Sequence, residues 1–133
     1  MNAHVHYRLT LQWALDEGLP ADEAEVVASS NVAVDREFPG NMLRYKGWHF
    51  AWFGARRRAR RLRAEAIRTS DPVLLGRALH CEQDALAHGN LGHVVHYSGI
   101  DLWDRRSERV RRRIEAASRE MIAAYRDRRS TYL

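Results

Sequence analysis

The amino-acid sequence predicts an all-α fold, and two observations support this prediction. Apolar residues recur at helical spacing in several segments of the chain, and proline or glycine stands at the boundaries between these segments. Of the 133 residues, 45% are hydrophobic and 29% are charged, an ordinary balance for a globular domain. We therefore expect residues 1–133 to form a single domain, a compact bundle of about five helices.

The first two helices are expected over residues 4–17 and from Pro20 onward. Gly18 suits the position that follows a helix C-terminus, and proline is favoured in the first turn of a helix. The apolar face of the second helix is interrupted by Asn31 and Asp35. Because a buried carboxylate needs a partner, we expect Asp35 to meet either one of the many arginines or a metal ion.

The middle of the chain contains two distinct segments, an aromatic one and an arginine-rich one. Residues 38–47 are expected to form a loop that leads into an aromatic wall, Trp48 to Phe53, where His49 is either a hydrogen-bonded core residue or a ligand. Residues 55–67 alternate arginines with small apolar residues, which predicts an amphipathic helix with a basic outer face. The net charge of +5 comes almost entirely from arginine, since Lys46 is the only lysine, and phosphate-bearing partners are physically plausible.

The next expected helix, residues 72–88, carries the residues that point most directly to chemistry. His80, Asp84 and His88 are four apart, so their side chains share one stripe of the helix, and that stripe contains no lysine or arginine. This pattern is typical of metal ligands, and the alternative is a solvated polar face. The only cysteine, Cys81, lies on a separate apolar stripe, where we interpret it as a buried structural thiol without a catalytic role.

Residues beyond this helix could extend the ligand set. His93 and His96 are three apart and share a face on a helical turn, so with His88 they could close a second metal site. Asp101 and Asp104 offer either a carboxylate ligand or an N-cap for the final helix.

A final helix is predicted by the apolar stripe from Val110 to Tyr125, with a tail from Arg126 that is expected to fray. No window approaches the ~18 apolar residues of a membrane span. The N-terminus lacks the layout of a secretory signal, so we expect a cytoplasmic protein.

In combination, these residues resemble the zinc-dependent phospholipase C and fungal single-strand nuclease superfamily, in particular its small bacterial relatives. The matching pieces cover roughly residues 4–104 and are His6-Tyr7, Asn31 to Asp35, His49, Leu79-His80 with Gln83-Asp84 and His88, and Gly92-His93. The resemblance implies an all-helical fold around a multinuclear site of two to three metal ions, usually zinc, that activate water for attack on a phosphoester.

The resemblance also implies which residues hold the ions. One ion would be surrounded by Asp35, His49, His80 and Asp84. Asp84 would bridge to a second ion, which also takes His6, and His4 could substitute for an N-terminal tryptophan ligand that this chain lacks. The third ion would take His88, His93 or His96, and Asp101 or Asp104. The chain is far shorter than the secreted phospholipases, so a lipid substrate is not implied.

The sequence therefore predicts a metal-dependent hydrolase for a small phosphate-bearing substrate, with Asp35 and Asp84 as its catalytic carboxylates. Zinc is the expected metal, and iron or manganese would suit the same residue types. Two alternatives remain open. One is an iron- or manganese-loaded biosynthetic or redox enzyme, and the other is a noncatalytic module that binds nucleic acid through its arginine-rich helix.

Overall fold

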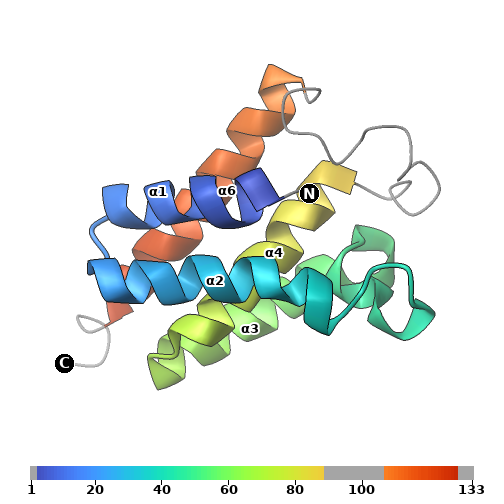
Figure 1. Ribbon diagram of the computed structural model, residues 1–133, viewed down its shortest axis with the longest axis horizontal. Helices are drawn as coiled ribbons and strands as arrows, with labels where there is room; N and C mark the ends of the chain where they lie inside the picture. Colours follow the sequence, from blue (N-terminus) through green and yellow to red (C-terminus); the bar gives the residue numbers. More distant parts are fainter. Residues whose placement is uncertain (1–2, 89–106, 129–133) are drawn as a thin grey trace.

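The computed structural model describes residues 3–88 and 107–128, and every regular element within these ranges is a helix (Figure 1). This confirms the all-helical prediction. The α-helices of these ranges are α1 (Thr10–Asp16), α2 (Ala21–Glu37), α3 (Ala55–Thr69), α4 (Pro72–His88) and α6 (Glu108–Arg126). Shorter turns accompany them: the π-helix η1 (His4–Leu9) and the 3₁₀ helices η2 (Leu43–Trp48) and η3 (Ala51–Phe53). None of the described helices combines the length and apolar content that crossing a membrane requires.

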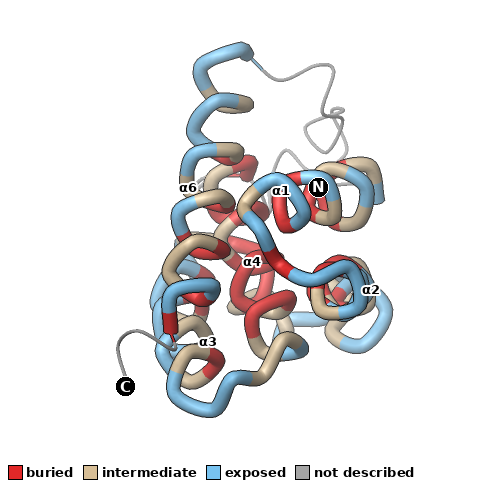
Figure 2. The backbone as a smooth tube through the Cα atoms, turned by 90° about the vertical axis from the view of Figure 1, so that its left-hand side faces the viewer, coloured by how far each residue is buried: buried red, intermediate tan, exposed pale blue. Residues whose placement is uncertain are grey.

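Helix α4 lies at the centre of the bundle and contacts α2, α3 and α6. Figure 2 shows its buried backbone enclosed by the other helices. The predicted boundaries of this helix are confirmed, and both of its stripes are buried: Ala78 and Cys81 on the apolar stripe, His80 and Asp84 on the polar one. A helix buried on both faces carries its polar side chains into the interior, where each needs a partner.

Helices α2 and α4 approach each other closely at Gly76. A Cβ added there would lie 2.4 Å from the backbone oxygen of Val27 and 2.8 Å from the Cβ of Ser30. Glycine alone permits this contact, because any side chain would push the two backbones apart. One turn further along α4, His80 reaches the main-chain carbonyl of Asn31 on α2 at 2.8 Å.

Apolar side chains form two core clusters, and α4 contributes to both. The larger cluster contains Val5, Trp13, Val27, Leu75, Leu79, Ile114, Met121, Ile122 and Tyr125, among others. The smaller cluster contains Val34, Trp48, Ala55, Ala59, Cys81 and Ala85. Small side chains dominate the second cluster, and this allows α3 to pack close to α4.

The first helical turns differ from the prediction, since residues 4–9 form the π-helix η1 rather than the start of an α-helix. The backbone N–H of Thr10 reaches back five residues to the carbonyl of Val5, which is the π-helical pattern. The hydroxyl of Thr10 donates to the same carbonyl at 2.8 Å and stabilises this wider turn. Within it, His6 is fully buried.

The segment between α2 and α3 also differs from the prediction. Residues 43–47, expected as part of a loop, belong instead to the helix η2, which ends at Trp48. The aromatic residues that follow do not make a continuous wall, since Trp48 and Phe50 are buried whereas Trp52 is 66% exposed. Tight 3₁₀ turns rotate successive side chains by about 120°, so neighbouring aromatic residues face different directions.

The C-terminal end of α6 is anchored, so the expectation of fraying from Arg126 is wrong for residues 126–128, and the rest of the tail lies outside the described residues. Arg128 donates to Ser70 Oγ at 3.0 Å and to Glu23 Oε1 at 2.9 Å, and its guanidinium lies over the ring of Tyr125. The hydroxyl of Tyr125 donates to the same carboxylate at 2.8 Å. We call Glu23, Ser70, Tyr125 and Arg128 the C-terminal network; it joins α6 to α2 and to the turn after α3.

Candidate metal centre

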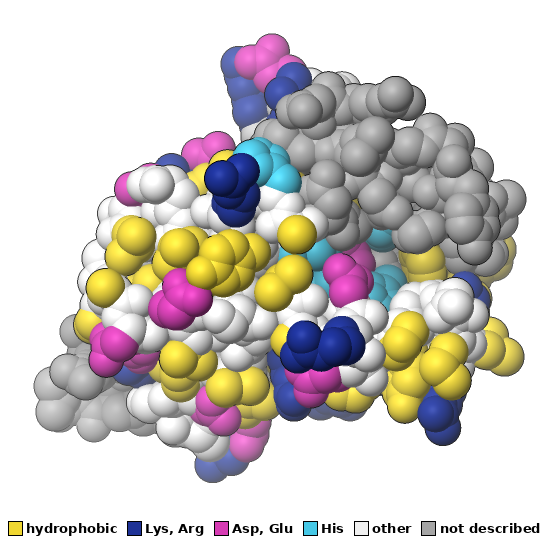
Figure 3. All heavy atoms as spheres, in the orientation of Figure 1, with side chains coloured by type: hydrophobic (Ala, Val, Ile, Leu, Met, Phe, Trp, Pro, Cys, Tyr) yellow, Lys and Arg dark blue, Asp and Glu magenta, His cyan; other side chains and the backbone are white. Residues whose placement is uncertain are grey.

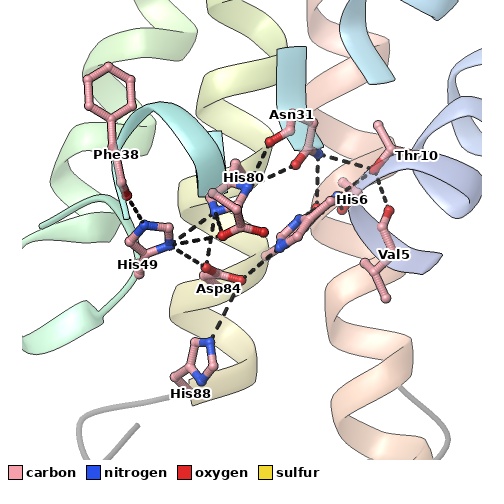
Figure 4. Close-up of polar contacts among 12 residues, drawn as sticks. Val5, His6, Thr10, Asn31, Phe38, His49, His80, Asp84 and His88 are labelled. Atoms are coloured by element: carbon pink, nitrogen blue, oxygen red, sulfur yellow. Dashed lines mark hydrogen bonds and ion pairs between the residues drawn. The ribbon is translucent and has the colours of Figure 1, made fainter. Parts of the chain in front are cut away.

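Five side chains from separate parts of the chain converge beside α4 (Figure 4). They are His6 of η1, Asp35 of α2, His49 after η2, and His80 and Asp84 of α4. We call these five residues the His–Asp site. In four of them, one ligand atom per residue lies within 4.8 Å of the other three: His6, Asp35, His80 and Asp84. The described structure thus contains a group of side chains that could hold a metal ion.

One oxygen of Asp84 lies in the tightest part of the site. Its Oδ2 is 2.8 Å from His49 Nδ1 and 3.1 Å from His80 Nε2, and these two nitrogens are 3.1 Å apart. Asp35 Oδ1 lies 3.4 Å from the same nitrogen of His80 and 3.7 Å from that of His49. Around a tetrahedral zinc ion, bonds of about 2.0–2.1 Å place neighbouring ligand atoms ~3.3 Å apart. These four atoms are therefore spaced as the ligands of one ion would be.

The other oxygen of Asp84 faces a different pair of histidines. Its Oδ1 lies 3.0 Å from His6 Nε2 and 3.8 Å from His88 Nε2. The contact with His6 is close but outside hydrogen-bonding geometry, and this buried nitrogen has no hydrogen-bond partner among the described residues. The two oxygens of the Asp84 carboxylate thus contact separate pairs of imidazole rings.

The outer ring nitrogen of three histidines faces an oxygen acceptor. The contacts are His80 Nδ1 to Asn31 O at 2.8 Å, His49 Nε2 to Phe38 O at 2.6 Å, and His6 Nδ1 to Gln83 Oε1 at 3.0 Å. A neutral imidazole carries one N–H, so a ring that donates outward presents a lone pair inward. The neutral form of each ring would therefore direct a lone pair at the carboxylates, which is how metal-binding histidines are commonly oriented.

The charges of the site leave an excess of negative charge. Burial lowers the pKa of His80, but Asp84 and Asp35 outweigh this effect and raise the pKa to about 9. Burial and the neighbouring His80 lower the pKa of His6 to about 4. Burial acts to raise the pKa of Asp84, yet His80 and His6 hold it well below its usual value. Near neutral pH, His6 and His80 together therefore carry one positive charge beside two carboxylates, which favours a cation.

Asp35 forms the exposed edge of the site. Its side chain is 46% exposed, whereas the side chain of His49 is 4% exposed and that of His80 is fully buried. The expectation of a core-facing Asp35 is therefore wrong, because the last turns of α2 carry this position to the surface. Figure 3 shows acidic and histidine side chains together where the surface is hollowed. A ligand in the site would meet solvent at this edge.

The structure brings together most, but not all, of the predicted site residues. His88 stands beside the five residues of the site, through its contact with Asp84. The half-buried His4 is not in the group of converging ligand atoms. Four further candidates lie outside the described residues and remain predictions: His93, His96, Asp101 and Asp104. The described start of α6 is capped by Ser107, whose hydroxyl accepts from the N–H of Val110.

Sequence reasoning missed a buried amide network beneath the site. At its centre is Gln83, which is fully buried on α4. Its side chain contacts His6, Thr10, Asn31 and Ser118. A signal was present in the sequence, because Gln83 follows His80 by three residues and Thr10 follows His6 by four. Both polar residues therefore lie on helix faces that carry predicted ligands.

A comparison with protein-family models found no match, and neither did comparisons with curated proteins and with solved structures. The resemblance to the phospholipase C and nuclease superfamily therefore stays a prediction. What the site can do chemically follows from the donor atoms, charges and exposure of its own residues.

Proposed function

We propose that the chain is a metal-dependent hydrolase that cleaves a phosphoester with metal-activated water. The observation that supports this most strongly is that carboxylate oxygens and imidazole nitrogens face one another at about 3 Å within the His–Asp site. Oxygen and nitrogen lone pairs about 3 Å apart repel one another unless a proton or a metal ion lies between them. The proton of His80 satisfies only part of the site, since His6 Nε2 has no hydrogen-bond partner within residues 3–88 and 107–128. A metal ion would satisfy these atoms together.

The two oxygens of Asp84 favour two ions. Oδ2 belongs with Asp35, His49 and His80, whereas Oδ1 belongs with His6 and His88. A carboxylate shared by two cations offsets their mutual repulsion in a poorly solvated interior. When bound, such a pair supplies Lewis acidity and lowers the pKa of water, and paired ions ~3.5–4 Å apart are common in phosphoester hydrolysis.

The chain's own residues would place the substrate at the exposed edge. Asp35 combines contact with the two inner histidines and access to solvent, so it is positioned to orient water or accept its proton. The buried ring of Phe50 lies beside two of the histidines, with its centroid 5.2 Å from that of His88 and 6.2 Å from that of His49. Exclusion of bulk water there strengthens electrostatic interactions within the site.

The choice of metal follows from the ligand types. Imidazole and carboxylate without thiolate suit zinc and also iron or manganese, so availability contributes to which ion is bound. We expect zinc. Elemental analysis of protein purified with and without oxygen distinguishes a zinc hydrolase from an iron- or manganese-loaded redox or biosynthetic enzyme, because iron would appear chiefly in the anaerobic preparation.

The decisive experiment compares two carboxylates of α2. Asp35→Asn should abolish hydrolysis of a panel of phosphomonoesters, phosphodiesters and nucleotides, and should lower metal content, without unfolding the protein, because the side chain is half exposed. Glu37→Gln is the matched control, since Glu37 is exposed two residues later and pairs with Arg77 instead. Turnover that survives chelation, or that survives Asp35→Asn, would refute the proposed function.

A second candidate function is supported by the outer face of α3. This helix holds seven arginines and one glutamate. Arg57, Arg60 and Arg61 are exposed, and no salt bridge to another described residue joins any of them. At helical spacing they share a face, which suits the phosphates of a nucleic acid.

This candidate is tested by nucleic-acid binding that weakens with salt. Binding should survive chelation and weaken in Arg60→Gln, whereas Arg112→Gln, at an exposed arginine already paired with Glu108, should change it less. Binding that is lost with the metal would instead assign any nucleic-acid contact to the His–Asp site.

A further inference from the structure

Gln83 precedes Asp84 on α4 and is fully buried beneath the His–Asp site. Its side-chain amide meets polar groups of four other helical elements, η1, α1, α2 and α6. The oxygen lies 3.0 Å from both His6 Nδ1 and Asn31 Nδ2, and the nitrogen lies 3.0 Å from Thr10 Oγ1 and 3.1 Å from Ser118 Oγ. Such a satisfied buried amide is held in one orientation.

The orientation of this amide follows from Thr10. The Thr10 hydroxyl has one hydrogen, which it donates to the Val5 carbonyl at 2.8 Å. Its contacts with the amide nitrogens of Asn31, at 3.2 Å, and of Gln83 must therefore be accepted ones. The nitrogen of Gln83 thus faces Thr10, and its oxygen faces His6.

This orientation determines which nitrogen of His6 carries hydrogen. An amide oxygen accepts only, so His6 must donate from Nδ1, and Nε2 then presents its lone pair toward Asp84 Oδ1 at 3.0 Å. His80 and His49 are oriented by main-chain carbonyls, which no side-chain substitution removes. His80 Nδ1 also lies 3.2 Å from Asn31 Oδ1, so of these three histidines only His6 faces a side chain without a main-chain carbonyl beside it.

We propose that Gln83 is a positioning residue that holds His6 in the Nδ1–H tautomer and so makes its Nε2 available as a metal ligand. The metal-binding part of this inference rests on the proposed function, whereas the tautomer does not. Partners that orient ligand histidines from outside commonly change metal affinity by about 10–100-fold when they are removed.

The first measurement is made on metal-free protein. Long-range ¹H–¹⁵N NMR near pH 7 should show the hydrogen of His6 on Nδ1. Gln83→Met removes the acceptor at similar length and should shift the hydrogen to Nε2, where Asp84 can accept it. Ser118→Ala is the matched control, because it removes a buried partner of Gln83 but leaves the oxygen facing His6. This control should leave the tautomer unchanged.

The second measurement is zinc affinity by competition with a chelator. Gln83→Met should weaken binding about 10–100-fold, while Ser118→Ala changes it by less than about threefold. Thr10→Val, which frees the amide to rotate, should give a smaller loss in the same direction and replaces Gln83→Met if that variant does not fold.

The outcomes separate the two proposals. A wild-type His6 with its hydrogen on Nε2, or variants that leave both tautomer and affinity unchanged, would overturn the role of Gln83. A tautomer that responds to Gln83 in a protein that binds no metal would refute the metal site while leaving the positioning role in place.

Discussion

Two partly buried polar clusters lie toward opposite ends of α2, and their polar groups are satisfied in different ways. In the C-terminal network, near the start of the helix, each contact joins a donor to an acceptor: Tyr125 and Arg128 donate to Glu23, and Arg128 also donates to Ser70. In the His–Asp site, near the end of α2, carboxylates and imidazole nitrogens face one another. Burial of polar groups is common to both clusters.

The difference teaches how to recognise a functional cluster. The C-terminal network pairs one cation with one anion and needs nothing further, so its role is to join helices. In the His–Asp site the outer ring nitrogens face carbonyl oxygens, and even with His80 protonated the inner atoms include more acceptors than hydrogens. An excess of inward-facing acceptors, rather than burial itself, is what indicates a bound cation.

The largest expected effect is the loss of metal from Asp84→Asn. Asp84 contacts His6, His49 and His80, and an amide supplies neither its charge nor two equivalent oxygens. Metal content by elemental analysis should fall to near zero, and any metal-dependent turnover should disappear with it. Glu82→Gln, on the same helix, should retain both. If Asp84→Asn kept the wild-type metal content, the claim that the His–Asp site binds metal, unlike the C-terminal network, would be wrong.

The next largest effect is expected from Gly76→Ala, which forces α2 and α4 apart. The added Cβ would meet Val27 O at 2.4 Å, so we expect a loss of about 3 kcal/mol in the free energy of unfolding and weaker metal binding. Gly54→Ala is the control, because its Cβ would meet nothing within 4 Å and only the positive φ is strained, at about 1–2 kcal/mol. Urea denaturation measures the free energy of unfolding of both variants. Equal losses would contradict the idea that Gly76 is needed for the close approach of α2 and α4.

A smaller effect is expected when the C-terminal network is weakened by Tyr125→Phe. The variant loses one hydrogen bond to Glu23 and should lose about 1 kcal/mol in the free energy of unfolding. Metal content should stay at the wild-type value, because Glu23 lies three helical turns from Asp35. A change in metal binding would show that the clusters are coupled.

The smallest expected effect is a pH dependence of the difference in unfolding free energy between the wild type and Tyr125→Phe. Burial and the hydrogen bond to Glu23 raise the pKa of Tyr125, so the folded protein holds the phenolic proton more tightly than the unfolded chain. Its contribution is complete below about pH 10 and is lost as pH rises further. The stability advantage over Tyr125→Phe should therefore stay constant from pH 8 to about pH 10 and shrink above that. A constant advantage would mean that the phenol titrates equally in both states.

Much of the fold was predictable because the apolar periodicity and the positions of proline and glycine indicate the same helix boundaries. Helix α4 follows the predicted range 72–88, where apolar and polar stripes lie side by side. The π-helix η1 was not predictable, because it depends on a hydroxyl contact between Thr10 and Val5 that ordinary helical spacing does not specify. The helix η2 was missed because Pro39 and Gly40 favour a loop and its stability depends on packing around Trp48.

The site was predictable where ligands share a helix and less so where tertiary packing decides. His80 and Asp84 follow from spacing alone, whereas the convergence of His6 and His49 on them required the arrangement of the helices. The exposure of Asp35 could not be read from its helical stripe, because that depends on where the neighbouring elements end. Gln83 was named in the resemblance without a role, because its burial and its contacts with His6, Thr10 and Ser118 depend on tertiary packing.

Gly76 sets the spacing of α2 and α4 through contact between their backbones, which cannot relax as side chains can. A cage formed between Asp35 and His80 would therefore resist widening around a larger ion. Calcium prefers six to eight oxygen ligands at about 2.3–2.6 Å and would gain little from so rigid and nitrogen-rich a set, whereas zinc needs four at about 2.0–2.2 Å. Selectivity among metals would then depend on a glycine one full helical turn away from His80.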